Sequence, residues 1–371
     1  MTPLKAPFPY FGGKSTVADI VWERLGDVDN YVEPLAGSAA MLLQRPHAAK
    51  VETLNDLDCM VSNFWRATKY APEKVVEWCD DPINEVDLHA RHRWLCGLGR
   101  CPRVRRKDMI FRHRMRNDPD CFCPKRAGWW VWGLCQWIGR GWCDRIGEGN
   151  AHRVRDQIPL ISGEGCGVHF ANLGTCADRR AWLLEWFGKL RDRLRRVRMC
   201  CGHWDRVCDS PTTMTRLGVT GVFLDPPYAE STGRYMGIYA EDCGVIAHQV
   251  REWCKRWGSD PLVRIALCGW NEEHAELESL GWDVVAWKSQ GGYANTGGVR
   301  EDDSHRRNER IWFSPACVAE PSLFSGLNKA LDTAPVRRKA LRNPAVLLLA
   351  RPLLRAGPRY NDQHHAGSGC V

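Results

Sequence analysis

The tetrapeptide Asp225-Pro226-Pro227-Tyr228 directly follows a short and mostly apolar run, Val219 to Leu224. Such a run predicts a buried strand, and two consecutive prolines prevent both its continuation and the start of a helix. Asp225 is therefore expected at the carboxyl end of a strand. Ligands bind at this edge in open α/β sheets, so a carboxylate and an aromatic ring presented there predict a catalytic or binding site.

A second set of residues that could take part in binding or catalysis lies in the first sixty positions. Asn30 to Glu33 predicts a strand, which small residues up to Gly37 connect to an apolar helix. Lys50 to Leu54 predicts the next strand, and Asp56 follows it about 20 residues after the glycine turn, where Rossmann-like folds hold ribose hydroxyls. These elements predict the first half of a Rossmann-like α/β sheet.

Lys14 follows two glycines and precedes a predicted helix, a pattern that resembles an anion-binding turn. A phosphate-binding loop needs a further glycine upstream, which this chain lacks, so a nucleotide triphosphatase is not expected.

The alternation of strand and helix stops after Asn63, resumes before Val219 and ends near Ala316. We therefore predict two parts of one sheet domain, an inserted and mainly helical domain, and a basic tail. The tail is expected to be disordered, because seven Lys or Arg and no acid stand between Arg337 and Arg359. The predicted boundaries are residues 1–65 and 199–315 for the sheet domain, 66–198 for the insertion and 316–371 for the tail.

Positive charge is concentrated in the predicted insertion. The whole chain carries a net charge of +8, but between Arg91 and Arg126 twelve Lys or Arg face only three acids. This excess predicts a polyanionic partner such as DNA, with a solvated basic face as the alternative. The candidate DNA-binding residues are Arg103, Arg105, Arg106, Lys107, Arg112, Arg114 and Arg116.

The insertion also contains a segment rich in tryptophan, Gly128 to Trp142. Its apolar residues fall at helical spacing, which predicts an aromatic core for the insertion. The alternative is that one or two exposed tryptophans stack on bases.

The chain has 18 cysteines, but no Cys-x-x-Cys pair. The start of the sequence does not resemble a secretory signal and no stretch resembles a membrane span, so reduced thiols in a bacterial or phage-infected cytoplasm are expected. Zinc was considered for Cys121, Cys123, Cys200, Cys201, Cys208 and His203, but adjacent or alternate cysteines are poor tetrahedral ligands. No metal is expected.

Three stretches together resemble the Dam-like family of DNA adenine-N6 methyltransferases, the alpha group with an Asp-Pro-Pro-Tyr tetrapeptide, many of them carried by phages. They are residues 9–14 (Pro-Tyr-Phe-Gly-Gly-Lys), 32–38 (Val-Glu-Pro-Leu-Ala-Gly-Ser) and 225–228. Residues 308–313 resemble the closing strand of the family, and Asn55-Asp56 its ribose-binding acid. The segments have the same order in the family, with the target-recognition insertion before the tetrapeptide. The resemblance covers about residues 5 to 315.

The resemblance implies a Rossmann-like, S-adenosylmethionine-dependent methyltransferase sheet with an inserted target-recognition domain. Leu35 stands where the family commonly has phenylalanine, and Ala39 where a second glycine often occurs. The implied partner is double-stranded DNA, with no membrane, and a monomer is compatible with this function. The implied cofactor contacts are Tyr10 and Lys14 on the methionine side, Glu33, Pro34, Ala36 and Gly37 beneath the cofactor, Asp56 at the ribose and Asp205 at the adenine amino group.

The residues fit this chemistry. The carboxylate of Asp225 and the carbonyl of Pro226 can accept both hydrogens of an adenine amine and orient its lone pair, while Tyr228 stacks on the flipped base. Pro227 completes the turn. Cytosine-N4 transfer is the closest alternative, because the amine chemistry is nearly the same. A non-catalytic DNA-binding protein on the same fold is the alternative from another class.

Overall fold

The computed structural model describes residues 3–10, 13–47, 50–96, 102–118, 120–137, 142–143, 158–159, 166–170, 176–228, 245–287 and 309–319, with backbone alone for 102–109, 176–177 and 212. By their contacts, residues 1–320 form one unit, to which all the described residues belong. The predicted tail lies outside the described residues beyond position 319. The domain boundaries within residues 1–320 stay predictions.

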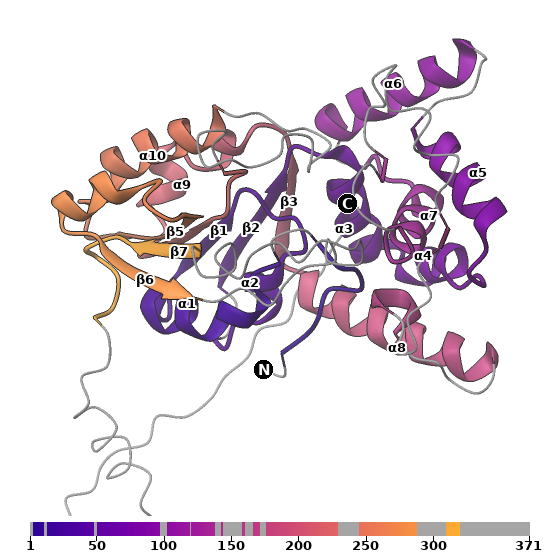
Figure 1. Ribbon diagram of the computed structural model, residues 1–371, viewed down its shortest axis with the longest axis horizontal. Coiled ribbons are helices and arrows are strands. Elements are labelled where there is room, and N and C mark those ends of the chain that lie inside the picture. Colours follow the sequence, from indigo (N-terminus) through magenta and orange to yellow (C-terminus); the bar gives the residue numbers. More distant parts are fainter. Residues whose placement is uncertain are drawn as a thin grey trace, which may run out of the picture. The chain divides into compact units, whose positions relative to one another are not determined.

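In the described part of the chain, seven strands form one sheet in the order β3-β2-β1-β4-β5-β7-β6 (Figure 1). Strands β1 to β5 run parallel, and β7 runs antiparallel to both of its neighbours. The strands are β1 Asn30–Glu33, β2 Val51–Asp56, β3 Val197–Cys201, β4 Thr220–Leu224, β5 Val263–Trp270, β6 Asp283–Trp287 and β7 Glu309–Phe313. This mixed α/β architecture is compatible with the predicted Rossmann-like fold.

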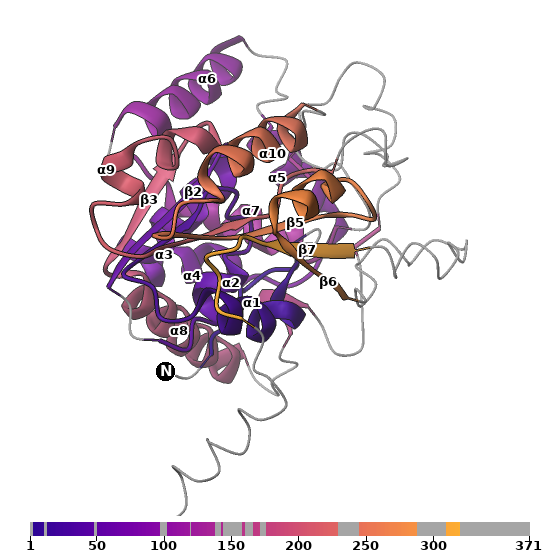
Figure 2. The ribbon, with the colours of Figure 1, turned by 90° about the vertical axis from the view of Figure 1, so that its left-hand side faces the viewer.

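The centre of the sheet is buried on both faces. Every residue of β1 and β4 is buried, as expected for parallel strands that are covered on both sides. Alternate residues enter different cores: Tyr31 and Phe223 belong to one hydrophobic cluster, whereas Val32 and Val222 belong to the other. Helices α9 and α10 cover one face, and α1, α2 and α8 the other (Figure 2).

Helices of eight residues or more connect and cover the strands. They are α1 Ala18–Leu25, α3 Cys59–Tyr70, α4 Pro72–Cys79, α5 Glu85–Leu95, α6 Pro102–Asn117, α7 Pro124–Leu134, α8 Cys176–Leu194 and α10 Ile246–Trp257. Shorter helical turns are η1 Ser15–Val17, α2 Ala40–Leu43, η3 Gly167–His169, η4 Trp204–Val207, α9 Pro211–Met214 and η6 Ala275–Leu280. Among the described helices, none is long and apolar enough to span a bilayer.

The predicted insertion is mainly helical in its described residues, although its last two residues, Val197 and Arg198, begin β3, and its tryptophans form part of a core. Trp130, Trp132, Trp137 and Trp142 are all buried in the cluster that also covers one face of the sheet. The core interpretation of this segment is thus confirmed for these four residues. Helix α8 is joined to the sheet by Arg193, whose guanidinium nitrogens lie 2.6 and 2.7 Å from the two carboxylate oxygens of Glu52 in β2.

Candidate functional site

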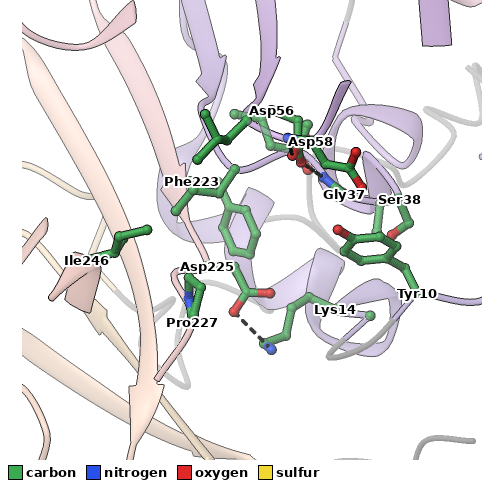
Figure 3. Close-up of a pocket in the computed structure, with 16 residues that line it drawn as sticks. Tyr10, Lys14, Gly37, Ser38, Asp56, Asp58, Phe223, Asp225, Pro227 and Ile246 are labelled. Carbon is green, nitrogen blue, oxygen red and sulfur yellow. Dashed lines mark hydrogen bonds and ion pairs between the residues drawn. The ribbon is translucent and has the colours of Figure 1, made fainter. Parts of the chain in front are cut away.

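A pocket opens where β1, β2 and β4 end (Figure 3). Parallel strands end at the same edge, and β1 and β4 are the neighbours between which the strand order reverses, where open α/β sheets bind ligands. The pocket is lined by Tyr10, Gly13, Lys14, Glu33, Leu35, Ala36, Gly37, Ser38, Ala40, Asp56, Leu57, Asp58, Phe223, Asp225, Pro227 and Ile246.

The ammonium group of Lys14 is the centre of a buried polar cluster. Its Nζ lies 3.1 Å from Oδ1 of Asp225, 3.4 Å from Oε2 of Glu309 and 3.2 Å from the hydroxyl of Tyr228. The Tyr228 hydroxyl in turn donates to Oε2 of Glu309 at 3.2 Å. The side chain of Lys14 is only 3% exposed, and those of Asp225 and Glu309 are 18% and 10% exposed. One cation therefore balances two carboxylates in a region with little water.

Strand direction explains how Glu309 reaches this cluster. Because β7 runs antiparallel to β5, its first residue, Glu309, pairs with Trp270 at the carboxyl end of β5. Glu309 is a site residue that the sequence did not indicate, because the sequence predicts a final short strand but not its direction. The antiparallel direction was the missing signal.

Burial and charge shift the ionisation of the cluster. Burial by itself lowers the pKa of Lys14, but its interactions with the nearby acidic groups, Asp225 first, outweigh burial and raise that pKa well above its ordinary value. Burial raises the pKa of Asp225, and the charge of Lys14 opposes this shift. Lys14 is therefore a permanent cation at this site at neutral pH.

Gly37 and Tyr10 form one wall of the pocket. Gly37 has a positive φ of 45°, and a Cβ at this position would collide with the ring of Tyr10. The backbone N–H of Gly37 donates to Oδ2 of Asp56 at 2.9 Å, and that of Asp58 donates to Oδ1 at 2.8 Å. Ala39, where the resembling family often has glycine, also adopts a left-handed conformation with φ 51°. The turn after β1 thus needs left-handed residues.

Two carboxyl groups at the strand ends have raised pKa values. Burial raises the pKa of Glu33 to about 8, although the backbone N–H of Leu42 and the hydroxyl of Tyr31 both donate to its Oε2 at 3.1 Å. Burial, together with the charge of Asp58, raises the pKa of Asp56 to about 7. Both groups lie in the pocket, and each would be stabilised in its ionised form by a cationic ligand.

Glu33→Gln tests this ionisation. The unfolded chain loses the Glu33 proton near the ordinary pKa of 4.5, whereas the folded chain keeps it up to about pH 8. In that interval this group lowers the free energy of unfolding by on the order of 1.4 kcal/mol per pH unit as the pH rises. Glutamine keeps both contacts through one oxygen and does not titrate, so the variant should gain stability over the wild type between about pH 5 and 8.

Urea denaturation at several pH values measures the difference between variant and wild type. Glu23→Gln, at an exposed position of α1, is the matched control and should give no such trend. A constant difference between Glu33→Gln and wild type across this pH range would contradict the raised pKa.

The structure brings most of the predicted cofactor and catalytic residues together. Tyr10, Lys14, Glu33, Ala36, Gly37, Asp56, Asp225 and Pro227 all line the pocket. Tyr228 is connected to them by its hydrogen bond with Lys14. Pro34 and Pro226 are not lining residues. The carbonyl of Pro34 instead accepts a hydrogen bond from the side chain of Asn55. Asp205 is not a lining residue either: its Oδ1 lies 2.7 Å from Nδ1 of His203, and both side chains are more than 40% exposed.

The predicted DNA-binding residues belong to α6, which packs on the sheet domain. Met115 of α6 lies in a small cluster with Cys59 of α3 and with Cys201, the last residue of β3. Cys201 marks the carboxyl edge of the sheet, so α6 is attached at the edge that holds the pocket. Arg114 and Arg116 are exposed and Arg112 is half-buried, while the side chains of Arg103, Arg105, Arg106 and Lys107 lie outside the described residues.

Comparisons with known proteins give no family for this chain. No model of a known protein family matches it. No curated protein matches it. An assignment of function therefore depends on the chemistry and the geometry of the pocket.

Proposed function

We propose that the protein transfers a methyl group from S-adenosylmethionine to N6 of an adenine in duplex DNA. The observation that carries the proposal is that Lys14, Gly37 and Asp225, from three segments far apart in the sequence, line one pocket at the switch point of the sheet.

The charge of the pocket fits a cationic cofactor. Among the described residues, four carboxyl groups line it, those of Glu33, Asp56, Asp58 and Asp225, and the basic residue of this described lining, Lys14, is paired with Asp225. A ligand with phosphate groups would oppose the ionisation of Glu33 and Asp56, whose pKa values are already raised to about 8 and about 7, whereas a ligand with a sulfonium and an ammonium group would stabilise their carboxylates. The lining thus favours S-adenosylmethionine over a nucleoside triphosphate.

Residues of the pocket match the parts of this cofactor. Both oxygens of Asp56 keep acceptor capacity beyond their backbone contacts and are suited to ribose hydroxyls. Glu33 offers a carboxyl group to the cationic end, and Leu35 and Phe223 offer apolar surface. When bound, S-adenosylmethionine supplies an electrophilic methyl group. Calorimetric titration should give binding of S-adenosylmethionine and not of ATP, and the reverse order would contradict the proposed site.

Asp225 is proposed to act on the target amine. The lone pair of an adenine amine is conjugated with the ring, which makes the amine a poor nucleophile. The Asp225 carboxylate and the Pro226 carbonyl accept its two hydrogens, orient the lone pair and stabilise the positive charge that develops on nitrogen. The excess proton then leaves through the carboxylate to solvent. Tyr228 stacks on the extruded base, whose extrusion costs a few kcal/mol.

Helix α6 is proposed to hold the DNA near the pocket. Its exposed arginines neutralise phosphates, and its attachment next to Cys201 brings them to the edge of the sheet where Asp225 lies. This arrangement supports DNA as the substrate over a small molecule.

Replacing Arg114 and Arg116 by glutamine should weaken DNA binding and reduce its salt dependence. Each lost phosphate contact lowers the slope of log K against log salt by about 0.9, so a loss of about 1.8 is the upper expectation for the pair. Arg195→Gln with Arg196→Gln is the matched control, because these exposed arginines precede β3 at the opposite edge of the sheet. Equal slopes for the two double variants, measured by fluorescence anisotropy, would contradict the role of α6.

Cytosine-N4 transfer is the second candidate, because Asp225 could accept the hydrogens of a cytosine amine in the same way. The modified nucleoside distinguishes the two. A product with N4-methylcytosine and without N6-methyladenine would replace the adenine assignment and keep the proposed cofactor and mechanism.

A further inference from the structure

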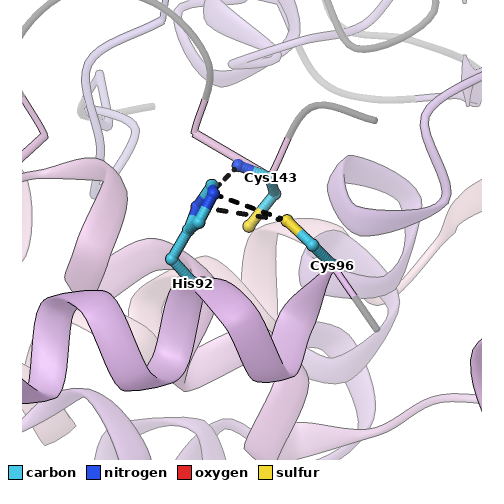
Figure 4. Close-up of side chains that lie close together, drawn as sticks. All are labelled: His92, Cys96 and Cys143. Atoms are coloured by element: carbon cyan, nitrogen blue, oxygen red, sulfur yellow. Dashed lines mark hydrogen bonds between the residues drawn. The ribbon is translucent and has the colours of Figure 1, made fainter. Parts of the chain in front are cut away.

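A cluster of three potential metal ligands lies in the helical part of the chain, outside the pocket. His92 and Cys96 are four residues apart at the end of α5 and therefore share one face of the helix, and Cys143 approaches them from a distant segment (Figure 4). One ligand atom from each residue can be chosen so that all three lie within 4.8 Å of one another. Sγ of Cys96 lies 3.8 Å from Nε2 and 4.0 Å from Nδ1 of His92.

The surroundings of His92 are unusual for an ordinary core histidine. The residue is fully buried, and its ring stacks on Trp137 at 4.8 Å with an interplanar angle of 14°. Its ring nitrogens contact Cys96 Sγ and, at 3.4 Å, the backbone N–H of Cys143. Sulfur is a weak hydrogen-bond partner, and the indole N–H of the nearby Trp142 is directed to the Trp130 carbonyl instead. The imidazole is thus buried beside a thiol, and the backbone hydrogen bond that it accepts from Cys143 is long, at 3.4 Å.

We propose that His92, Cys96 and Cys143 bind a zinc ion. Zn–S bonds of about 2.3 Å and Zn–N bonds of about 2.0 Å place the ligand atoms of a tetrahedral site roughly 3.5 to 3.8 Å apart. The distances of 3.8 and 4.0 Å between Cys96 and His92 are close to this range, so small movements are sufficient. Binding converts both thiols to thiolates and releases two protons to solvent, while the imidazole binds as the neutral ring and gives up the long hydrogen bond that Nδ1 accepts from the Cys143 N–H.

Zinc fits the donor set better than other common ions. Two thiolates and an imidazole exclude calcium and magnesium, which bind oxygen ligands. Water takes the fourth position of the proposed tetrahedral site. His92, Cys96 and Cys143 form no Cys-x-x-Cys pair, so their spacing gives no zinc signal, and the sequence alone predicts no metal.

The packing of α5 gives the ion a structural role. Its buried residues are Leu88, Arg91, His92 and Leu95, so only two apolar side chains anchor an eleven-residue helix. A metal bond from α5 to Cys143 joins this helix to a segment beyond α7, and such bonds contribute directly to folding. Cys143 also has a positive φ of 60°, a conformation that a bond to its side chain would help to hold. This inference is independent of the proposed methyltransferase function.

Metal analysis of the full-length protein tests the site. After removal of loosely bound metal, mass spectrometry of the elements should give one zinc per chain in the wild type, and less than about a tenth of this in the double variant Cys96→Ala, Cys143→Ala. Cys123→Ala is the matched control, because Cys123 contacts Asn63 only through its backbone in the described structure, and it should keep the full zinc content.

A second measurement uses the wild type, so its result does not depend on whether the alanine variants fold. Cobalt exchanged into the wild type should give strong visible absorption and thiolate-to-cobalt charge-transfer bands, typical of a tetrahedral site with sulfur ligands. Cys96→His retains a ligand and should keep the metal with weaker charge transfer. Absence of zinc from the wild type, a disulfide between Cys96 and Cys143, or full zinc in the double variant would overturn the proposal.

Discussion

Asp225→Ala is expected to lower methyl transfer to DNA by about a thousand-fold or more, because the carboxylate both orients the amine and stabilises its developing charge. Cofactor binding should be largely retained, since the other carboxyl groups of the pocket remain. The fold should be retained as well, because Lys14 keeps a second carboxylate partner, Glu309, at 3.4 Å.

Transfer of a labelled methyl group, together with calorimetric titration of the cofactor, separates these effects. Asp192→Ala is the matched control: the side chain of Asp192 is exposed, pairs with Arg191 and lies outside the pocket lining, so this variant should keep most of the activity. Turnover by Asp225→Ala near the wild-type rate would refute the catalytic role. A loss of cofactor binding equal to the loss of turnover would assign Asp225 to binding instead.

Lys14→Met is expected to destabilise the protein by on the order of 3 kcal/mol or more at pH 8. It leaves the carboxylates of Asp225 and Glu309 close together in a buried region without their cation. Protonation of one carboxyl group relieves part of this repulsion, so the loss should become smaller as the pH falls. Urea denaturation at pH 6 and pH 8 measures both effects.

Lys74→Met is the matched control, because Lys74 pairs with Glu77 at 3.0 Å but both side chains are exposed, and such pairs contribute about 1 kcal/mol or less. The double variant Lys14→Met, Asp225→Asn should recover part of the lost stability, since it removes one of the two buried carboxylates that have lost their cation. Equal losses for Lys14→Met and Lys74→Met would show that the buried cluster does not depend on its cation.

The positions of the strand ends were predictable because parallel strands leave a simple signal. The apolar run before Asp225 and the short strand before Asp56 became β4 and β2, and both acids lie in the pocket. A strand that is buried on both faces consists mainly of apolar residues, and the two consecutive prolines end it. The helical structure of Gly128 to Leu134 and the burial of its tryptophans Trp130 and Trp132 were predictable because apolar residues recur in this segment at helical spacing.

The contacts between distant segments were not predictable from the sequence. Lys14 was expected on the methionine side of a cofactor, and its contact with Glu309 depends on the reversed direction of β7. Strand direction in the sheet is set by tertiary packing, and residue patterns within one strand do not encode it. The contact of Tyr10 with Gly37 likewise depends on how two segments meet.

The positive charge of the basic segment was predictable from composition, but the position of this segment on the sheet was not. Attachment of α6 next to Cys201 depends on Met115 and Cys59, apolar residues that carry no functional signal in the sequence.

The proposed activity is tested most directly by the nucleosides of DNA after reaction. Unmethylated duplex DNA is incubated with the purified protein and S-adenosylmethionine that carries a labelled methyl group, then digested and analysed by mass spectrometry. We expect the label in N6-methyladenine with the wild type and its loss with Asp225→Ala. Binding of both DNA and cofactor without any labelled nucleoside would contradict the account and identify a non-catalytic DNA-binding protein.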